Sequence, residues 1–176
     1  LDRAHRIARV AVNLALALQL GEPQLSDIER AVMLRDTVDP PTPDEINSLA
    51  ILKGVPLLAR ATGIALAAHQ RYDGSGILHG QFGEEIPLGG RIIAVAAAYD
   101  KLVSGVDRLA FAEAMEVLSR ERASRFDPKV VDALRMLQPS ATFPSSISAE
   151  GERGDRASFG RGPGLAMDDP RRIWAR

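Results

Sequence analysis

The sequence predicts an all-α helical bundle of about six or seven helices. Of its 176 residues, 45% are hydrophobic but only 5% are aromatic, so the core must be built mainly from Ala, Leu, Val and Ile, as in helix bundles. Apolar residues recur at helical spacing, and no segment alternates as a half-buried strand would. Capping residues, glycines and prolines divide this pattern into separate helices.

Two helices are expected first, over residues 2–20 and 26–36. The first carries apolar residues at every third or fourth position, and Gly21 with Pro23 supplies a helix stop. Ser26, followed three residues later by Glu29, has the pattern of a capping box and predicts the start of the second.

Three prolines then break the chain, because proline stops a helix and restricts the residue before it. Two further helices are expected over residues 44–53 and 56–71. Pro87 suits a helix start, and the nearly all-apolar residues 88–102 predict a buried helix.

Residues 109–122 are amphipathic, and Asp127 with Pro128 gives an N-cap and a first-turn proline for a last helix. One helical domain is therefore expected over residues 1–137. In residues 138–176, Pro, Ser, Gly, Arg and Asp dominate without periodicity, which predicts a low-complexity, disordered tail.

Composition excludes several classes of function. A net charge of −1 gives no electrostatic reason to expect nucleic acid or an anionic membrane as partner. The absence of cysteine excludes disulfides and thiolate metal sites, and it fits a cytoplasmic location. No apolar run is long enough for a membrane segment. Because Leu1 already lies inside a helical pattern, we expect an upstream segment.

A glycine-rich segment organises the chain. Gly74, Gly76, Gly80 and Gly83 fall within ten residues and are closed by Pro87, so regular helix or strand is excluded there. Loops placed between helices in this way often carry function.

The motifs in and after this segment identify a family. Residues 73–78 read Asp-Gly-Ser-Gly-Ile-Leu, residues 83–88 read Gly-Glu-Glu-Ile-Pro-Leu, and residues 99–102 read Tyr-Asp-Lys-Leu. This ordered set resembles the HD-GYP family, bacterial metal-dependent phosphohydrolases that degrade cyclic di-GMP. The resemblance implies an HD-domain-like helical bundle.

The resemblance also implies a centre of two or three metal ions, of which His5, Asp36 and His69 occupy ligand positions. Arg35 replaces a family histidine, and Ala97 replaces a metal-binding aspartate. We therefore expect the residual site to be empty and no cofactor to be bound. The alternative is one divalent Fe, Mn or Zn held by the three residues, with Asp36 as the candidate catalytic group. A third hypothesis is that Asp36 forms an ion pair with Arg35 and that the histidines are interior residues without a metal.

Ligand recognition is better preserved. Arg91 matches a family arginine whose planar fork suits phosphate. Asp73, Gly74 and Gly76 of the loop and Arg108 complete the candidate ligand-binding set, although Asp73 also suits a structural role in the turn.

The leading functional hypothesis is a degenerate HD-GYP-type signalling domain in the cyclic di-GMP network that acts by protein interaction. Its expected partners are signalling proteins of that network, including diguanylate cyclase domains, with a sensor or receiver domain upstream in the same chain, as in a response regulator. One alternative is a weak phosphodiesterase with a single residual metal. Another is a noncatalytic receptor for cyclic di-GMP.

Overall fold

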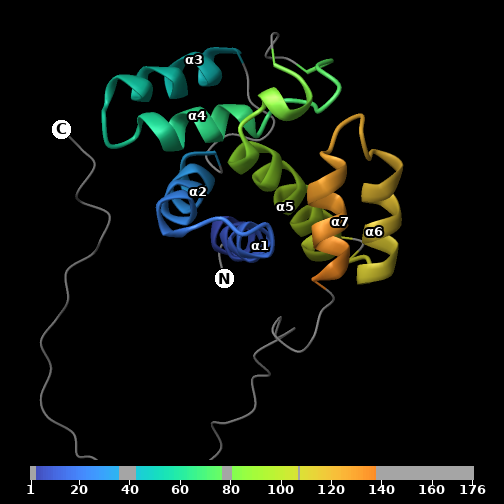
Figure 1. Cartoon of the computed structure of the whole chain (residues 1–176). Coiled ribbons are helices and arrows are strands. Elements are labelled where there is room, and N and C mark those ends of the chain that lie inside the picture. The colour runs from blue at the N-terminus through green and yellow to red at the C-terminus, as the bar shows by residue number, and fades with distance from the viewer. Residues whose placement is uncertain (1–2, 36–42, 77–80, 107, 138–176) are drawn as a thin grey trace, which may run out of the picture. The chain divides into compact units, whose positions relative to one another are not determined.

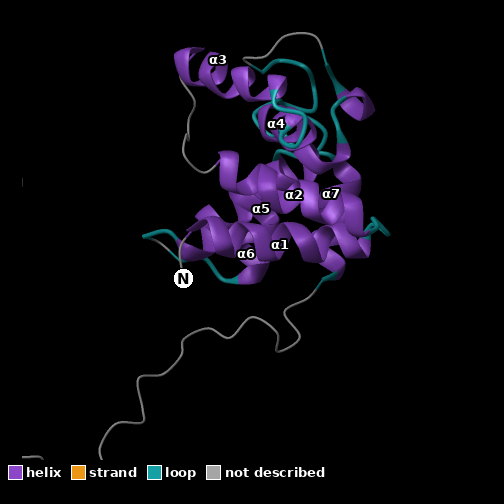
Figure 2. Ribbon diagram, turned by 90° about the vertical axis from the view of Figure 1, so that its left-hand side faces the viewer, coloured by secondary structure: helices purple, strands orange, loops and turns teal. Residues whose placement is uncertain are grey.

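The computed structural model describes residues 3–35, 43–76, 81–106 and 108–137, and within these ranges it is all-helical with no strand. This confirms the predicted fold class (Figure 2). The described elements are α1 (Arg3–Ala17), α2 (Glu22–Arg35), α3 (Pro43–Ile51), the 3₁₀ turn η1 (Leu52–Gly54), α4 (Ala59–Ala67), the 3₁₀ turn η2 (Gly83–Glu85), α5 (Leu88–Ser104), α6 (Phe111–Arg120) and α7 (Pro128–Met136). The tail predicted to be disordered, residues 138–176, lies outside them.

Helix α5 lies at the centre of the bundle and is largely buried, and its burial was predicted from its apolar sequence. It packs against α1, α2, α4, α6 and α7 (Figure 1). Ile92, Ile93, Val95 and Ala96 are fully buried on it. A helix that is apolar around most of its circumference can only be stable when other helices cover it on several sides.

Helices α4 and α5 approach closely because glycine stands at their crossing. A Cβ atom on Gly90 would lie 2.6 Å from the Cβ of Ala67 and 2.9 Å from its carbonyl carbon. Small residues allow two helix backbones to come together, and van der Waals contacts then replace water. The crossing holds the start of α5 against the segment that follows α4.

The boundary between α1 and α2 differs from the prediction. Helix α1 ends at Ala17, and Gln19 adopts a left-handed φ of 63° while the amide of Leu20 donates to the carbonyl of Ala15 at 2.9 Å. This is the hydrogen-bond pattern of a Schellman ending, so Gln19, and not Gly21, is the left-handed residue that ends the helix.

Helix α2 begins at Glu22, four residues before the predicted N-cap Ser26. The carbonyl of Gly21 accepts from the amides of Gln24 and Leu25 at 3.0 and 3.1 Å. Pro23 therefore sits in the first turn, where a missing N–H costs nothing because no intrahelical acceptor exists for it. The capping-box prediction at Ser26 was wrong for this reason.

The later helices follow the prediction with shifted ends. Helices α3 and α4 are each shorter than expected, with η1 and a turn between them. Helix α7 starts as predicted: Asp127 is its N-cap, and Oδ1 of Asp127 accepts from the amide of Lys129 at 2.8 Å. Among the described helices, none is long and apolar enough to cross a membrane.

Candidate functional site

The glycine-rich loop begins where α4 ends, and its first part is a closed hydrogen-bonded turn. The carboxylate of Asp73 accepts from the amide of Ser75 at 2.9 Å and from its hydroxyl at 2.6 Å. Arg71 Nε in turn donates to the Ser75 hydroxyl at 2.8 Å. Gly74 has a φ of 79°, a conformation that favours glycine, so the turn depends on it.

These hydrogen bonds also fix the charge of Asp73. The hydroxyl of Ser75 and then its amide lower the pKa of Asp73 from 3.8 to about 2, because both stabilise the ionised carboxylate. Gly76 is required for a different reason, since a Cβ there would lie 2.9 Å from the amide nitrogen of Arg71. The candidate ligand residues Asp73, Gly74 and Gly76 thus lie together, and each takes part in holding the turn.

The loop is hydrogen-bonded to the connection between α6 and α7. Amides of residues 72–73 donate to carbonyls of residues 124–125 at 3.2 and 2.8 Å. Glu84 of η2 forms an ion pair with Lys129 of α7 at 2.5 Å, and this bond lowers the pKa of Glu84 and raises the pKa of Lys129. Both side chains are largely exposed, so the pair adds little stability by itself. The backbone contacts fix the position of the loop.

Arg91, the candidate phosphate ligand, is engaged inside the protein. Its Nη1 lies 2.5 Å from Oδ2 of Asp127, and its Nε donates to the carbonyl of Ile86 at 2.8 Å. The Asp127 side chain is fully buried, and only 12% of the Arg91 side chain is exposed. A buried carboxylate needs such a partner because the ionised group loses its hydration. Binding of phosphate by Arg91 would have to compete with Asp127.

A second buried carboxylate belongs to Asp100 on α5, and the sequence did not predict its burial or its partner. Arg6 of α1 approaches it with two nitrogens, Nε at 2.7 Å from Oδ1 and Nη2 at 3.1 Å from Oδ2. The hydroxyl of Ser104 adds a third donor at 3.1 Å. The two charged residues are 94 positions apart, so no local pattern announces the pair. The Asp100 carboxylate is thereby fully engaged in joining α1 to α5.

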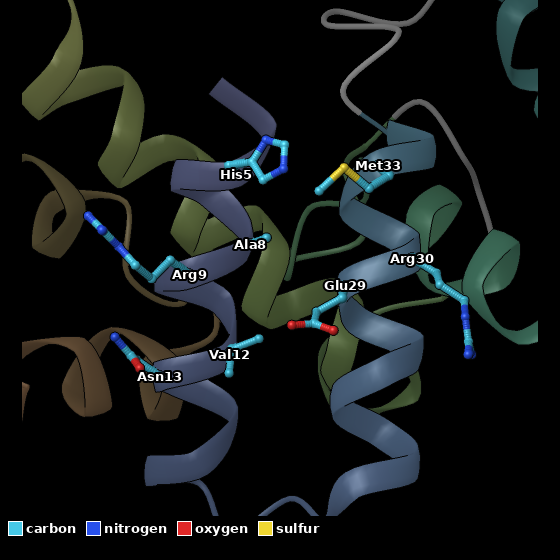
Figure 3. A pocket seen from close by; sticks show the side chains of 8 residues that line it. All are labelled: His5, Ala8, Arg9, Val12, Asn13, Glu29, Arg30 and Met33. Carbon is cyan, nitrogen blue, oxygen red and sulfur yellow. The ribbon is translucent and has the colours of Figure 1, made fainter. Parts of the chain in front are cut away.

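His5, the first candidate metal ligand, lies on an open groove. The groove has a volume of about 440 Å³ and runs between α1 and α2, with Ala8 and Val12 on the α1 side (Figure 3). His5 faces Met33 across it, and Glu29 points into it from α2. His5 is exposed, so the interpretation of this histidine as an interior residue was wrong. The residues that line the groove do not include His69.

The rest of the candidate metal set is incomplete. His69 follows α4 and is half-buried, while Asp36 lies outside the described residues, so the convergence of the three ligands stays a prediction. In the ranges that the structure describes, no group of three His, Cys, Asp or Glu side chains is placed to hold a metal ion. Ala97 is buried on α5 and Arg35 is buried at the end of α2. Neither side chain can donate an electron pair to a metal, so these two positions do not fit a two-metal centre.

Arg108, the last candidate ligand residue, stands apart from the loop. It lies between α5 and α6, is exposed, and has a φ of 33°. The structure therefore gathers Asp73, Gly74 and Gly76 but gives no contact between them and Arg108.

Comparison with known proteins yields matches to an HD domain and to cyclic dinucleotide phosphodiesterases. A family model described as HD domain matches residues 45–130. The chain is 34% identical, over 154 residues, to the cyclic di-GMP phosphodiesterase response regulator RpfG of Xanthomonas campestris pv. campestris. This alignment covers 73% of the chain and 41% of that protein. A 3'3'-cGAMP-specific phosphodiesterase 2 of Vibrio cholerae is 30% identical, with 73% of the chain and 30% of that protein covered.

A solved structure supports the same fold. The crystal structure of a cyclic GMP-AMP specific phosphodiesterase of V. cholerae aligns with a TM-score of 0.60 at 18% identity, covering 77% of this chain and 43% of that one. At this identity the likeness shows the fold alone. The chain spans less than half the length of each of these proteins.

Proposed function

We propose, from the premise that this chain belongs to the HD domain family, that it is a degenerate HD-GYP-type signalling domain of the cyclic di-GMP network. It acts through protein interaction and not through hydrolysis. The observation that carries this proposal is Ala97, a buried methyl group on the central helix at the position where the HD-GYP resemblance places a metal-binding aspartate.

The chemistry of hydrolysis explains why this position matters. Two metal ions in a phosphodiesterase activate water and stabilise the attacking and leaving oxygens, and each ion needs several donor side chains. A methyl group at Ala97 donates nothing. A permanently charged guanidinium at Arg35 repels a cation and competes for carboxylates nearby. The proposal therefore assigns no catalytic step to this chain.

The ion pair between Arg91 and Asp127 is a second observation that supports a noncatalytic role. The arginine suited to phosphate contributes to the interior of the domain, where its partner is a fully buried carboxylate. We therefore expect the surface of the domain to bind other proteins. The candidates are signalling proteins of the cyclic di-GMP network, including diguanylate cyclase domains, and a sensor or receiver domain of the same chain. A cytoplasmic location is part of this proposal.

The experiment that tests it measures turnover. Purified protein is incubated with cyclic di-GMP or with 3'3'-cGAMP, in the presence of Mn²⁺ or Fe²⁺, and the linear products are quantified beside an active two-metal phosphodiesterase. We expect no product above the protein-free background. Metal-dependent turnover that is lost in Asp36→Ala would overturn the proposal and favour the single-metal enzyme.

Metal content separates the same two hypotheses without an activity assay. Protein purified without chelators is analysed for Fe, Mn and Zn by mass spectrometry. We expect far less than one metal per chain. One tightly held ion per chain that is lost in both His5→Ala and His69→Ala would favour the enzyme.

The receptor alternative makes a different prediction. A noncatalytic receptor binds cyclic di-GMP without hydrolysing it, and calorimetric titration detects this directly. Loss of binding in Arg108→Ala with an unchanged melting temperature would support a receptor. Binding that is lost only together with the fold, as in Arg91→Ala, would not.

A further inference from the structure

The turn between α3 and α4 exposes an unusual amount of aliphatic surface. We call residues 51–57 the apolar turn. Ile51 is 76% exposed, Leu57 is 74% exposed and Val55 is 44% exposed. Figure 1 shows this turn at the end of the α3–α4 pair that points away from α5. Exposed aliphatic side chains that gather on one segment mark a surface that meets an apolar partner.

The backbone of the apolar turn is already hydrogen-bonded within itself. The amide of Val55 donates to the carbonyl of Leu52 at 3.0 Å, and the amide of Leu58 donates to the carbonyl of Val55 at 2.9 Å. A backbone amide without such a partner is costly to move out of water. The turn can therefore enter an apolar phase without exposing these two amides to it.

Along the sequence, the charged residues next to the apolar turn are both basic. Lys53 and Arg60 are exposed beside it, and the sequence contains no acidic residue from Ile46 through Tyr72. The net charge of −1 for the whole chain conceals this local excess. An anionic surface close to the turn is attracted by these two exposed cations.

We propose that the apolar turn docks on the surface of a membrane that bears anionic lipid headgroups. Ile51, Val55 and Leu57 enter the boundary between headgroups and acyl chains, while Lys53 and Arg60 stay at headgroup level. A convex aliphatic turn needs no matching pocket in a bilayer, whereas a protein partner would have to supply one. A few aliphatic side chains and two cations make a weak, reversible anchor. This inference does not depend on the proposed signalling function.

The absence of cysteine allows a direct test. Leu57→Cys carries a single environment-sensitive fluorophore on the apolar turn. Met136→Cys, at a residue 85% exposed on α7, carries the same fluorophore as the matched control. With vesicles of phosphatidylcholine and phosphatidylglycerol, we expect a blue shift for the label at position 57 and none at 136. Equal shifts at both positions, or none at 57, would overturn the proposal.

Sedimentation with vesicles tests the unlabelled chain. The double change Ile51→Asp with Leu57→Asp should weaken partitioning about tenfold or more, and Met136→Asp should not change it. Lys53→Gln with Arg60→Gln should weaken binding to phosphatidylglycerol vesicles and remove its salt dependence. Binding that is unaffected by both pairs of changes would contradict the proposal.

A protein partner is the competing occupant of the same surface. If the label at position 57 shifts as protein concentration rises without vesicles, and light scattering shows a doubled mass, the apolar turn joins two copies of the chain. That result would also overturn the membrane proposal.

Discussion

Arg91 of α5 and Asp127 at the N-cap of α7 form an ion pair of 2.5 Å that is almost wholly enclosed. Two further polar atoms of the pair are also hydrogen-bonded. Arg91 Nε donates to the carbonyl of Ile86, and Asp127 Oδ1 accepts from the amide of Lys129. One pair of side chains thus connects the end of the glycine-rich loop, the central helix and the start of α7.

Removing the arginine should destabilise the domain strongly. Arg91→Ala leaves the carboxylate of Asp127 buried without its cation, which lowers the free energy of unfolding by about 3 kcal/mol. Denaturant unfolding measures this. The matched control is Arg122→Ala, because its partner Asp132 is 2.5 Å away but both side chains are about half exposed. The control should lose less than about 1 kcal/mol. Equal losses in the two variants would show that burial does not determine the strength of the first pair.

The close approach of α4 and α5 predicts opposite effects at two helical glycines. Gly90→Ala places a methyl group 2.6 Å from the Cβ of Ala67, so the helices must move apart, and stability falls by about 1–3 kcal/mol. Gly63→Ala in α4 meets nothing within 4 Å and should raise stability by up to about 1 kcal/mol, since alanine favours helix. Thermal melts compare the two. A stabilised Gly90→Ala would contradict the close packing.

The turn at Gly74 gives a third prediction. Its φ of 79° is strained for a residue with a side chain, and its Cβ would lie 3.1 Å from Phe82, so Gly74→Ala should lower the free energy of unfolding by about 1–3 kcal/mol. Gly54 has open space and no left-handed φ. Gly54→Ala should therefore change stability little. Indistinguishable melting temperatures for the two variants would show that the glycine-rich loop tolerates substitution.

The lowered pKa of Asp73 predicts that the stability of the domain depends on pH. Its pKa is about 2 in the folded protein, below the ordinary 3.8, so its contribution to stability is fully present above pH 3.8 and is lost as the pH falls through about 2. Carbon NMR of the carboxyl group measures the pKa. Ser75→Ala removes the strongest hydrogen bond and should raise the pKa toward 3.8, whereas the remote Ser48→Ala should leave it unchanged. A folded-state pKa near 3.8 in the original protein would contradict the turn geometry.

Several features of this chain are determined within short stretches of sequence. The all-helical class follows from the period of the apolar residues, and the start of α7 follows from Asp127 and Pro128. The glycine-rich segment was predicted to interrupt the helices, and Gly74 in it has the left-handed φ that only a loop needs. Each of these features depends on a residue and its immediate neighbours in the sequence. It can therefore be predicted without the tertiary structure.

Other features were decided by the packing of helices. Arg91 meets Asp127 across 36 positions and Arg6 meets Asp100 across 94, so no motif contains both partners of either pair. The sequence therefore predicted that Arg91 binds phosphate. Only the packing of α5 against α7 showed its buried partner. The start of α2 at Glu22 was missed because a first-turn proline resembles a helix stop. Burial of the two carboxylates makes the loss of either arginine costly, and burial is a property of the folded chain, not of any local segment.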